Sequence, residues 1–303
     1  EGIIIFTMFN NNNFVTRDYT YLFHGMLSST IFSIALNFRV VLNYLLYGAF
    51  KVFVNPLYEE INYASSYYIL LLCFCIMKIL DNNKKAKFIT SIYIIMSALI
   101  LLAILLSTSR SAYASLLLLA LAFLAIFFKN NNIFKQGMLI LLLLISIFYI
   151  APKFVVLYKV MNSRFSSLTH PYGGKIDPRF IIWLETVKQN LINPLGIGLN
   201  NIRYYTDYEI PEHNTILQSW SAYGLVSISL LHLMIKQLYK LFSTVSLKDN
   251  IDVLLVLIIL SYAPFIITLN LLTSRHFWVI ISLIFARNKL LGDLSFTYDI
   301  SGR

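Results

Sequence analysis

Residues 89–128, ITSIYIIMSALILLAILLSTSRSAYASLLLLALAFLAIFF, decide the fold class of this chain. Two apolar runs flank the short polar stretch STSRSA at 107–112, and each run approaches the roughly 20 residues that a helix needs to cross a bilayer. Neither run alternates apolar and polar residues as the strands of a membrane barrel do. The stretch therefore predicts two membrane-spanning helices joined by a tight turn that carries Arg110.

The rest of the chain has the same apolar character. Its 303 residues are 58% hydrophobic and 13% charged, whereas a soluble domain has about 45–50% apolar and about 25% charged residues. We expect an all-α polytopic membrane protein in which residues 1–303 form a single membrane domain of about eight spans. The expected spans are residues 25–50, 64–80, 89–107, 112–128, 137–157, 215–242, 251–272 and 273–287. Because the sequence begins with Glu1 rather than Met, we expect further helices to precede it.

Basic residues assign the two sides of the membrane. When the expected spans are counted, the short lysine-rich loops fall on one side, which the positive-inside rule makes cytoplasmic. These loops are 81–88, 129–136 and 236–249, together with the tail after residue 286. The net charge of +10 thus reflects topology and contact with anionic lipid, and we expect no nucleic-acid partner. The outer side then holds the STSRSA turn, the TSRH turn at 273–276 and one long loop at 151–213.

The long outer loop, residues 151–213, exceeds the roughly 12–15 residues of a plain connection, and we expect it to be the catalytic loop. Within it PRFIIWLETVKQNLI, residues 178–192, predicts a helix, because Pro178 suits a first helical turn. Its apolar residues recur every three or four positions, which is typical of an amphipathic helix lying on a membrane surface. They are Phe180, Trp183, Leu184, Val187 and Leu191. Arg179 and Trp183 are four apart, so they are neighbours on this helix.

A glycine-containing turn follows this helix. We interpret NPLGIGL, residues 193–199, as a flexible tight turn. Its two glycines do not make a dinucleotide-binding fingerprint, because GIGLNN lacks the third glycine and a preceding strand.

The stretch PEHNTILQSWSAYGL, residues 211–225, places His213 just before the expected span 215–242. Asn214 or Thr215 can cap that helix. A histidine here titrates near neutral pH and can exchange protons, and the adjacent Glu212 is a candidate to orient it. Gly224 predicts a close approach between helices.

Two arginines, Arg110 and Arg275, lie at the expected outer ends of helices. Each is either an interfacial anchor or a phosphate clamp, since the planar guanidinium matches phosphate oxygens. The acidic residues of the outer side, among them Glu209 and Glu212, are not spaced to form the oxygen cage that a hard cation needs. We therefore expect neither a metal nor another cofactor. Cys73 and Cys75 are expected to be buried apolar residues rather than ligands.

Three motifs occur in a characteristic order: SRSA at the outer end of a helical hairpin, RFIIW followed by NPLGIGLNN in the long loop, and EHNTILQSWSAYGL leading into the next helix. In this order they resemble the O-antigen ligase/O-antigen polymerase family of bacterial membrane glycosyltransferases, over about residues 60–245. The resemblance implies a metal-independent transferase in the bacterial cytoplasmic membrane, with its active site facing outward. Its donor is a glycan on undecaprenyl diphosphate, and its acceptor is a hydroxyl of another glycan or of lipid A–core.

The resemblance also implies roles for individual residues. It places diphosphate binding on Arg110 and Arg179 and acceptor activation on His213. The supporting positions that we expect around them are Glu212, Asn214, Trp183 and Arg275. Ligase and polymerase both remain open as functions. A transporter related to this family and a non-catalytic component of a polysaccharide export complex are the alternatives, because intramembrane arginines also line ion paths.

Overall fold

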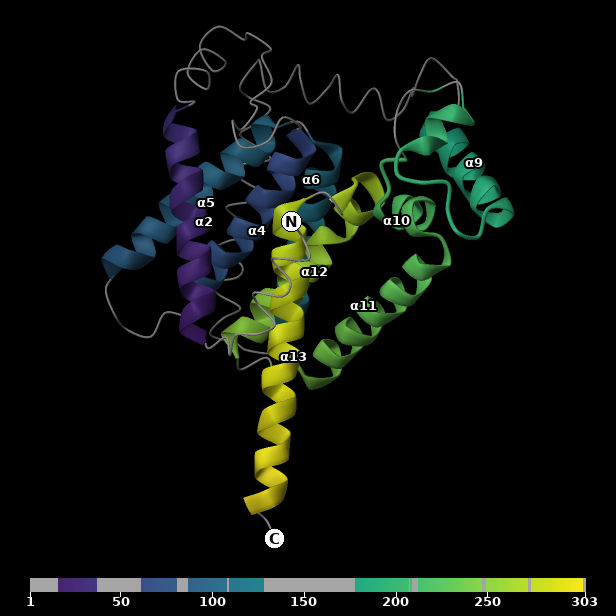
Figure 1. Ribbon diagram of the computed structural model, residues 1–303. Coiled ribbons are helices and arrows are strands. Elements are labelled where there is room, and N and C mark those ends of the chain that lie inside the picture. Colours follow the sequence, from purple (N-terminus) through teal and green to yellow (C-terminus); the bar gives the residue numbers. More distant parts are fainter. Residues whose placement is uncertain are drawn as a thin grey trace, which may run out of the picture. The chain divides into compact units, whose positions relative to one another are not determined.

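A computed structural model describes residues 16–36, 61–80, 87–107, 109–127, 178–206, 208, 212–246, 249–271 and 274–301. These described residues form helices, turns and connecting segments without a β-strand, which confirms the all-α class (Figure 1). The contacts divide the chain into two compact units. The N-terminal unit comprises residues 20–173 and 256–265, and the C-terminal unit comprises residues 1–19, 174–255 and 266–303.

The N-terminal unit is built around one fully apolar helix. It contains most of α2 (Thr16–Leu36), with α4 (Ile61–Leu80), α5 (Lys87–Leu106), α6 (Arg110–Phe127) and the middle of α12 (Asn250–Thr268). The side chains of α4 from Ala64 to Met77 are buried, and this helix packs on both α5 and α6. Cys73 and Cys75 lie in this core as free thiols, as expected.

Helix lengths bear on the number of membrane spans. Among the described residues, three helices are long and apolar enough to cross a bilayer. They are Asn62–Leu80, Leu225–Thr244 and Asn250–Thr268, and the shorter apolar helices are Phe88–Ile104 and Arg110–Leu124. The expected span 137–157 and the second half of the span 25–50 lie outside the described residues. The protein is therefore a helical membrane protein, and the expected number of eight spans stays a prediction.

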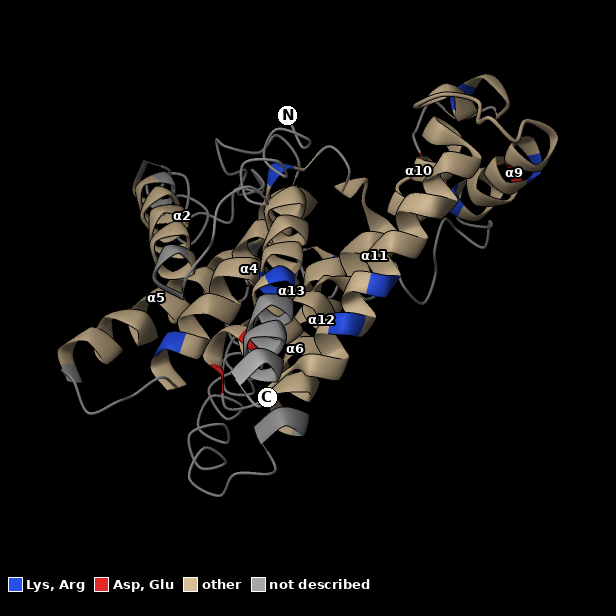
Figure 2. Ribbon diagram, turned by 60° about the horizontal axis from the view of Figure 1, so that its bottom comes forward, with Lys and Arg blue, Asp and Glu red and all other residues tan. Residues whose placement is uncertain are grey.

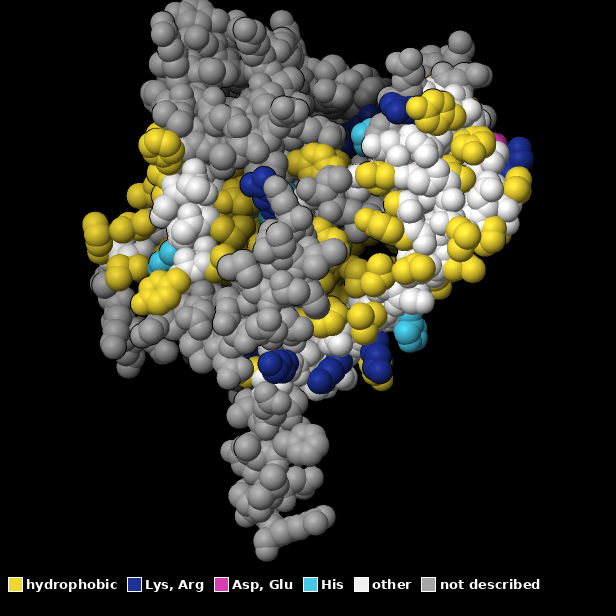
Figure 3. Space-filling view, viewed as in Figure 1, with side chains coloured by type: hydrophobic (Ala, Val, Ile, Leu, Met, Phe, Trp, Pro, Cys, Tyr) yellow, Lys and Arg dark blue, Asp and Glu magenta, His cyan; other side chains and the backbone are white. Residues whose placement is uncertain are grey.

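The C-terminal unit contains α9 (Pro178–Ile192), the 3₁₀ helix η3 (Asn201–Tyr204), α10 (Thr215–Tyr223), α11 (Leu225–Thr244), α13 (Arg275–Ser301) and both ends of α12. The prediction of one span over 215–242 is wrong, because the chain breaks at Gly224 into α10 and α11. Ser227 and Leu241 alone are buried among the described side chains of α11. Figure 3 shows its exposed hydrophobic side chains beside those of α9 and α10. Such a surface suits contact with lipid.

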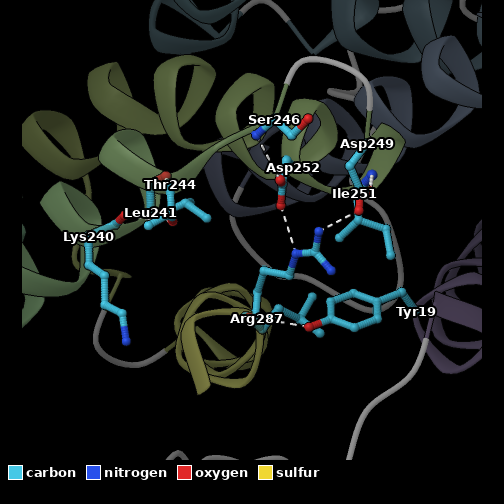
Figure 4. A network of polar contacts seen from close by, with 10 residues as sticks. Tyr19, Lys240, Leu241, Thr244, Ser246, Asp249, Ile251, Asp252 and Arg287 are labelled. Carbon is cyan, nitrogen blue, oxygen red and sulfur yellow. Dashed lines mark hydrogen bonds and ion pairs between the residues drawn. The ribbon is translucent and has the colours of Figure 1, made fainter. Parts of the chain in front are cut away.

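A buried ion-pair cluster joins the loop between α11 and α12 to α13 (Figure 4). The Arg287 Nε donates to Asp252 Oδ1 over 2.7 Å, and a terminal nitrogen of the same guanidinium pairs with Asp249. The second oxygen of Asp252 accepts a hydrogen bond from the backbone N–H of Ser246 over 2.9 Å. Arg287 is thus neutralised and buried, so it does not count as a free cation for topology. Basic positions on α11 and α9 remain on an otherwise weakly charged ribbon (Figure 2).

We expect Arg287→Ala to lower the free energy of unfolding by about 3–5 kcal/mol, because it leaves the buried Asp252 without its counter-charge. The measurement is thermal unfolding of the full-length protein in detergent. Lys289→Ala is the matched control, since Lys289 is exposed on the same helix and should unfold at the wild-type temperature. Equal melting temperatures for Arg287→Ala and the wild type would contradict a stabilising role for the cluster.

Candidate active site

Arg110 is the first residue of α6, and serine side chains fix the turn in front of it. The hydroxyl of Ser109 donates to Asn62 Oδ1 over 2.7 Å and accepts from the backbone N–H of Ala112, so it caps α6. The hydroxyl of Ser65 donates to that of Ser107 over 2.8 Å. The turn is therefore anchored to the start of α4, which gives Arg110 a defined backbone position.

The side chain of Arg110 is exposed and makes no ion pair or hydrogen bond with the described residues. It lies at the amino end of α6, where the helix dipole is positive and the first backbone N–H groups lack helical partners. A second positive charge at this point favours an anion rather than a neutral ligand. Arg110 belongs to the N-terminal unit, whereas the other predicted site residues belong to the C-terminal unit.

Helix α9 has the predicted bounds, Pro178–Ile192, and an unexpected buried face. The side chains that it buries are Ile182, Thr186 and Asn190, which lie one turn apart. Its large apolar side chains point outward instead: Phe180 is 54% exposed, and Leu184 and Leu191 are 73% and 70% exposed. The helix thus packs on the protein through a small, partly polar face. Its apolar face stays available for a membrane surface, as the sequence predicts.

One hydrogen bond joins α9 to the turn that carries the histidine. The indole Nε1 of Trp183 donates to the backbone carbonyl of Glu212 over 2.6 Å. Arg179 lies one turn before Trp183 on α9, and His213 directly follows Glu212. The structure therefore brings the helix of Arg179 and the turn of His213 together within the C-terminal unit.

The backbone around His213 is tightly defined. His213 is half-buried and has a φ of 45°, in the left-handed region that a non-glycine residue seldom occupies. Asn214 caps α10, as predicted, because its Oδ1 accepts from the N–H groups of Ile216 and Leu217 over 3.0 and 3.1 Å. The histidine thus leaves the helix axis at a fixed point rather than from a loose loop.

Thr215 has a role that the sequence did not reveal. Its hydroxyl donates to the carbonyl of Leu269 over 2.7 Å and accepts from the N–H of Leu271 over 3.1 Å. Leu271 stands four residues before Arg275, which is exposed at the first position of α13. The start of α10 is therefore tied to the segment that leads to Arg275. Thr215 was read as an alternative cap, and no pattern in the sequence indicates a partner that lies 54 residues away.

The turn PLGIG is docked on the helix break at Gly224 and is not a flexible connection. The N–H of Leu225 donates to the carbonyl of Pro194 over 2.9 Å, and the N–H of Gly198 donates to that of Ser221 over 2.8 Å. Gly196 and Gly224 have φ values of 88° and 57°. A Cβ atom on Gly224 would overlap backbone atoms of Pro194 and Leu195. Two motifs of the sequence thus form one interlocked backbone unit.

We expect Gly224→Ala to destabilise the protein by about 3 kcal/mol or more, because it adds left-handed strain to a clash with backbone that has little room to move. The melting temperature in detergent measures the effect. Gly25→Ala is the matched control, since a Cβ there meets nothing within 4 Å and alanine favours the helix. A Gly224→Ala protein as stable as the wild type would show that the turn is not docked in this way.

Glu212 is completely buried, at 0% exposure. Burial raises the pKa of its carboxyl group, while the backbone and the nearby Ser221 hydroxyl lower it to a smaller extent. Among the described residues no cluster of three histidine, cysteine, aspartate or glutamate side chains could hold a metal ion. The chemistry that the described groups offer is proton exchange at His213 and anion binding at the arginines.

Comparison with known proteins agrees with these motifs. Residues 95–231 match the family model described as O-antigen ligase. No curated protein and no solved structure gave a match. The matched segment contains Arg110, Arg179, the PLGIG turn and His213. On this match the chain belongs to the O-antigen ligase/O-antigen polymerase family of membrane proteins.

Proposed function

We propose that this protein is a membrane glycosyltransferase that moves a glycan from undecaprenyl diphosphate to a hydroxyl acceptor at the outer face of the cytoplasmic membrane. The family match supports an O-antigen ligase-like transferase in general. The acceptor is a second lipid-linked glycan if the protein is a polymerase, or lipid A–core if it is a ligase. The active site on this proposal consists of Arg110, Arg179 and His213.

The observation that carries the proposal is the hydrogen bond from Trp183 to the backbone of Glu212, at 2.6 Å. It joins a helix that carries an arginine to the backbone position of a histidine. A transferase of this kind needs a cation for the departing diphosphate and a base for the attacking hydroxyl, and it needs them on elements that move together.

The proposed reaction forms a bond between the acceptor oxygen and the anomeric carbon and breaks the bond from that carbon to the diphosphate oxygen. Neutral His213 takes the proton of the acceptor hydroxyl. The lipid diphosphate leaves with the bonding electron pair, so negative charge grows on it. Arg110 and Arg179 stabilise that charge through fixed hydrogen-bond donors, and the exposed, unpaired guanidinium of Arg110 is suited to this role.

The exposed apolar face of α9 supports an interfacial position for Arg179. Phe180 and Leu184 flank Trp183 in the sequence, and both side chains are exposed. A helix that buries such a face in the boundary between headgroups and acyl chains lies parallel to the membrane. That depth is where the diphosphate of a lipid-linked glycan lies.

Deletion of the gene, followed by gel analysis of surface polysaccharide, tests the proposal. A polymerase predicts single repeat units on lipid A–core in the deletion strain, and a ligase predicts bare core. Complementation with the full-length gene should restore long chains. An unchanged polysaccharide pattern in the deletion strain would contradict both forms of the proposal, and uptake of a solute by vesicles that carry the purified protein would favour a transporter.

A further inference from the structure

The interface between α9 and α10 is lined with polar side chains that lack hydrogen-bond donors. Asn190 Nδ2 donates to the Ser221 hydroxyl over 3.1 Å, which joins the two helices. Four buried oxygens here accept no hydrogen bond from the described residues. They are both carboxyl oxygens of Glu212, Oδ1 of Asn190 and Oε1 of Gln218. The interface therefore has too many acceptors for the donors that the described residues supply.

A charged Glu212 would make this imbalance worse. Both of its oxygens would be pure acceptors, and the backbone carbonyl of the same residue already accepts from Trp183. The Ser221 hydroxyl lies close enough to act on the carboxyl group, yet it does not complete a hydrogen bond of good geometry. An isolated carboxylate is among the most costly groups to bury, whereas a carboxylic acid brings one donor of its own.

No described cation offsets the charge of Glu212. The charged side chains on the surrounding elements are Arg179, Glu185 and Lys188 on α9 and Arg203 on η3, with His213 next in the chain and Tyr208 and Tyr223 as further titratable groups. Glu185 and Lys188 pair with each other over 3.5 Å. None of these groups contributes to the pKa of Glu212, which burial alone raises.

We propose that Glu212 is a positioning residue for His213, and that it acts as a neutral carboxylic acid shared with the acceptor oxygens of the α9–α10 interface. The inference rests on the proposed role of His213 as the base. Glu212 does not touch the substrate on this proposal. Its buried side chain and its carbonyl bond to Trp183 together hold the left-handed backbone of His213, so that the imidazole keeps one orientation toward the acceptor.

The sign of the pH effect follows from the raised pKa of Glu212. Below the folded pKa the group is neutral and the interface is closed. Above it, ionisation places a charge in the buried interface and loosens the turn, so transfer should decline on the alkaline side. Protonation of His213 as a base should produce the decline on the acidic side, and the two limbs are therefore separable.

Infrared spectroscopy and a pH profile test the proposal on the full-length protein in vesicles that contain lipid-linked glycan extracted from the deletion strain. The wild type should show the stretching band of a buried protonated carboxyl group at neutral pH. Glu212→Gln should lose that band, keep transfer within about threefold, and lose the alkaline decline. Glu212→Ala should lower kcat by about 10–100-fold, because the imidazole is misplaced. Glu185→Gln is the control, since this exposed carboxylate contributes no such band.

Two outcomes overturn the proposal: a wild-type protein without the band, or a Glu212→Gln protein as inactive as Glu212→Ala. The second would mean that the negative charge itself is needed. The infrared result stands independently of transfer. If His213→Ala retained activity, the proposed base would fail while the charge state of Glu212 would still be measured.

Discussion

Replacement of His213 by alanine is expected to lower glycan transfer by about 10²–10⁴-fold, the usual contribution of a general base. The structure sharpens the choice of substitution, because φ at this residue is 45° and asparagine tolerates that region well. His213→Asn should keep the turn and the cap of α10 while it removes the base. We therefore expect His213→Asn to fold with the wild-type melting temperature and to be as inactive as His213→Ala.

His232→Ala is the matched control for the histidine prediction. This second histidine of the C-terminal unit is exposed on α11, and its loss should leave transfer within about twofold of the wild type. The measurement is the initial rate with full-length protein and extracted lipid-linked glycan. Wild-type rates in His213→Asn would remove the imidazole from the mechanism, whatever the fate of the arginines.

Helix α9 shows what a periodic sequence predicts and what it leaves open. Its bounds, Pro178–Ile192, agree with the prediction, since a proline in the first turn and apolar residues at three-four spacing are local signals. The face that packs on α10 is built from Ile182, Thr186 and Asn190, and two of these are polar. Hydropathy assigns such residues to water, so their burial depends on a partner helix that the sequence pattern does not identify.

The division of α10 from α11 depends on a contact that is distant in sequence. TILQSWSAYGLVSISLLHLM reads as one apolar helix, because an isolated glycine is tolerated inside a membrane helix. The break at Gly224 occurs because the backbone of Pro194 and Leu195 occupies the space beside it. The prediction that Gly224 allows a close approach is confirmed, but the approaching element is a turn and not a helix.

The candidate site divides in the same way. Asn214 is recognised as a cap from sequence alone, because capping involves only the next three residues. The bond from Trp183 to Glu212 and those of Thr215 to residues 269 and 271 join segments that are 29 to 56 residues apart. Arg287 was counted as a topological cation, and its ion pairs with Asp249 and Asp252 are equally invisible in a linear pattern.

Arg110→Ala and Arg179→Ala are each expected to lower transfer by about 10²–10³-fold, because each removes a fixed donor from the departing diphosphate. Lysine at either position should restore only part of the rate, since an ammonium group keeps the charge but loses the planar fork of donors. Inorganic diphosphate should inhibit the wild type, and its inhibition constant should rise in both alanine variants. The readouts are the initial rate and this inhibition constant, measured on the full-length protein in vesicles.

Arg203→Ala is the control for these substitutions, because its guanidinium is exposed on η3 and stacks on the Tyr204 ring at 5.1 Å. The double variant Arg110→Ala/Arg179→Ala carries the decisive comparison. If both arginines bind the same diphosphate, the double loss will be smaller than the product of the single losses, because the second substitution removes an interaction that is already weakened. Independent losses that multiply would show that Arg110 and Arg179 act at separate sites, although they belong to different units of the chain. A wild-type rate in either single variant would remove that arginine from the diphosphate site.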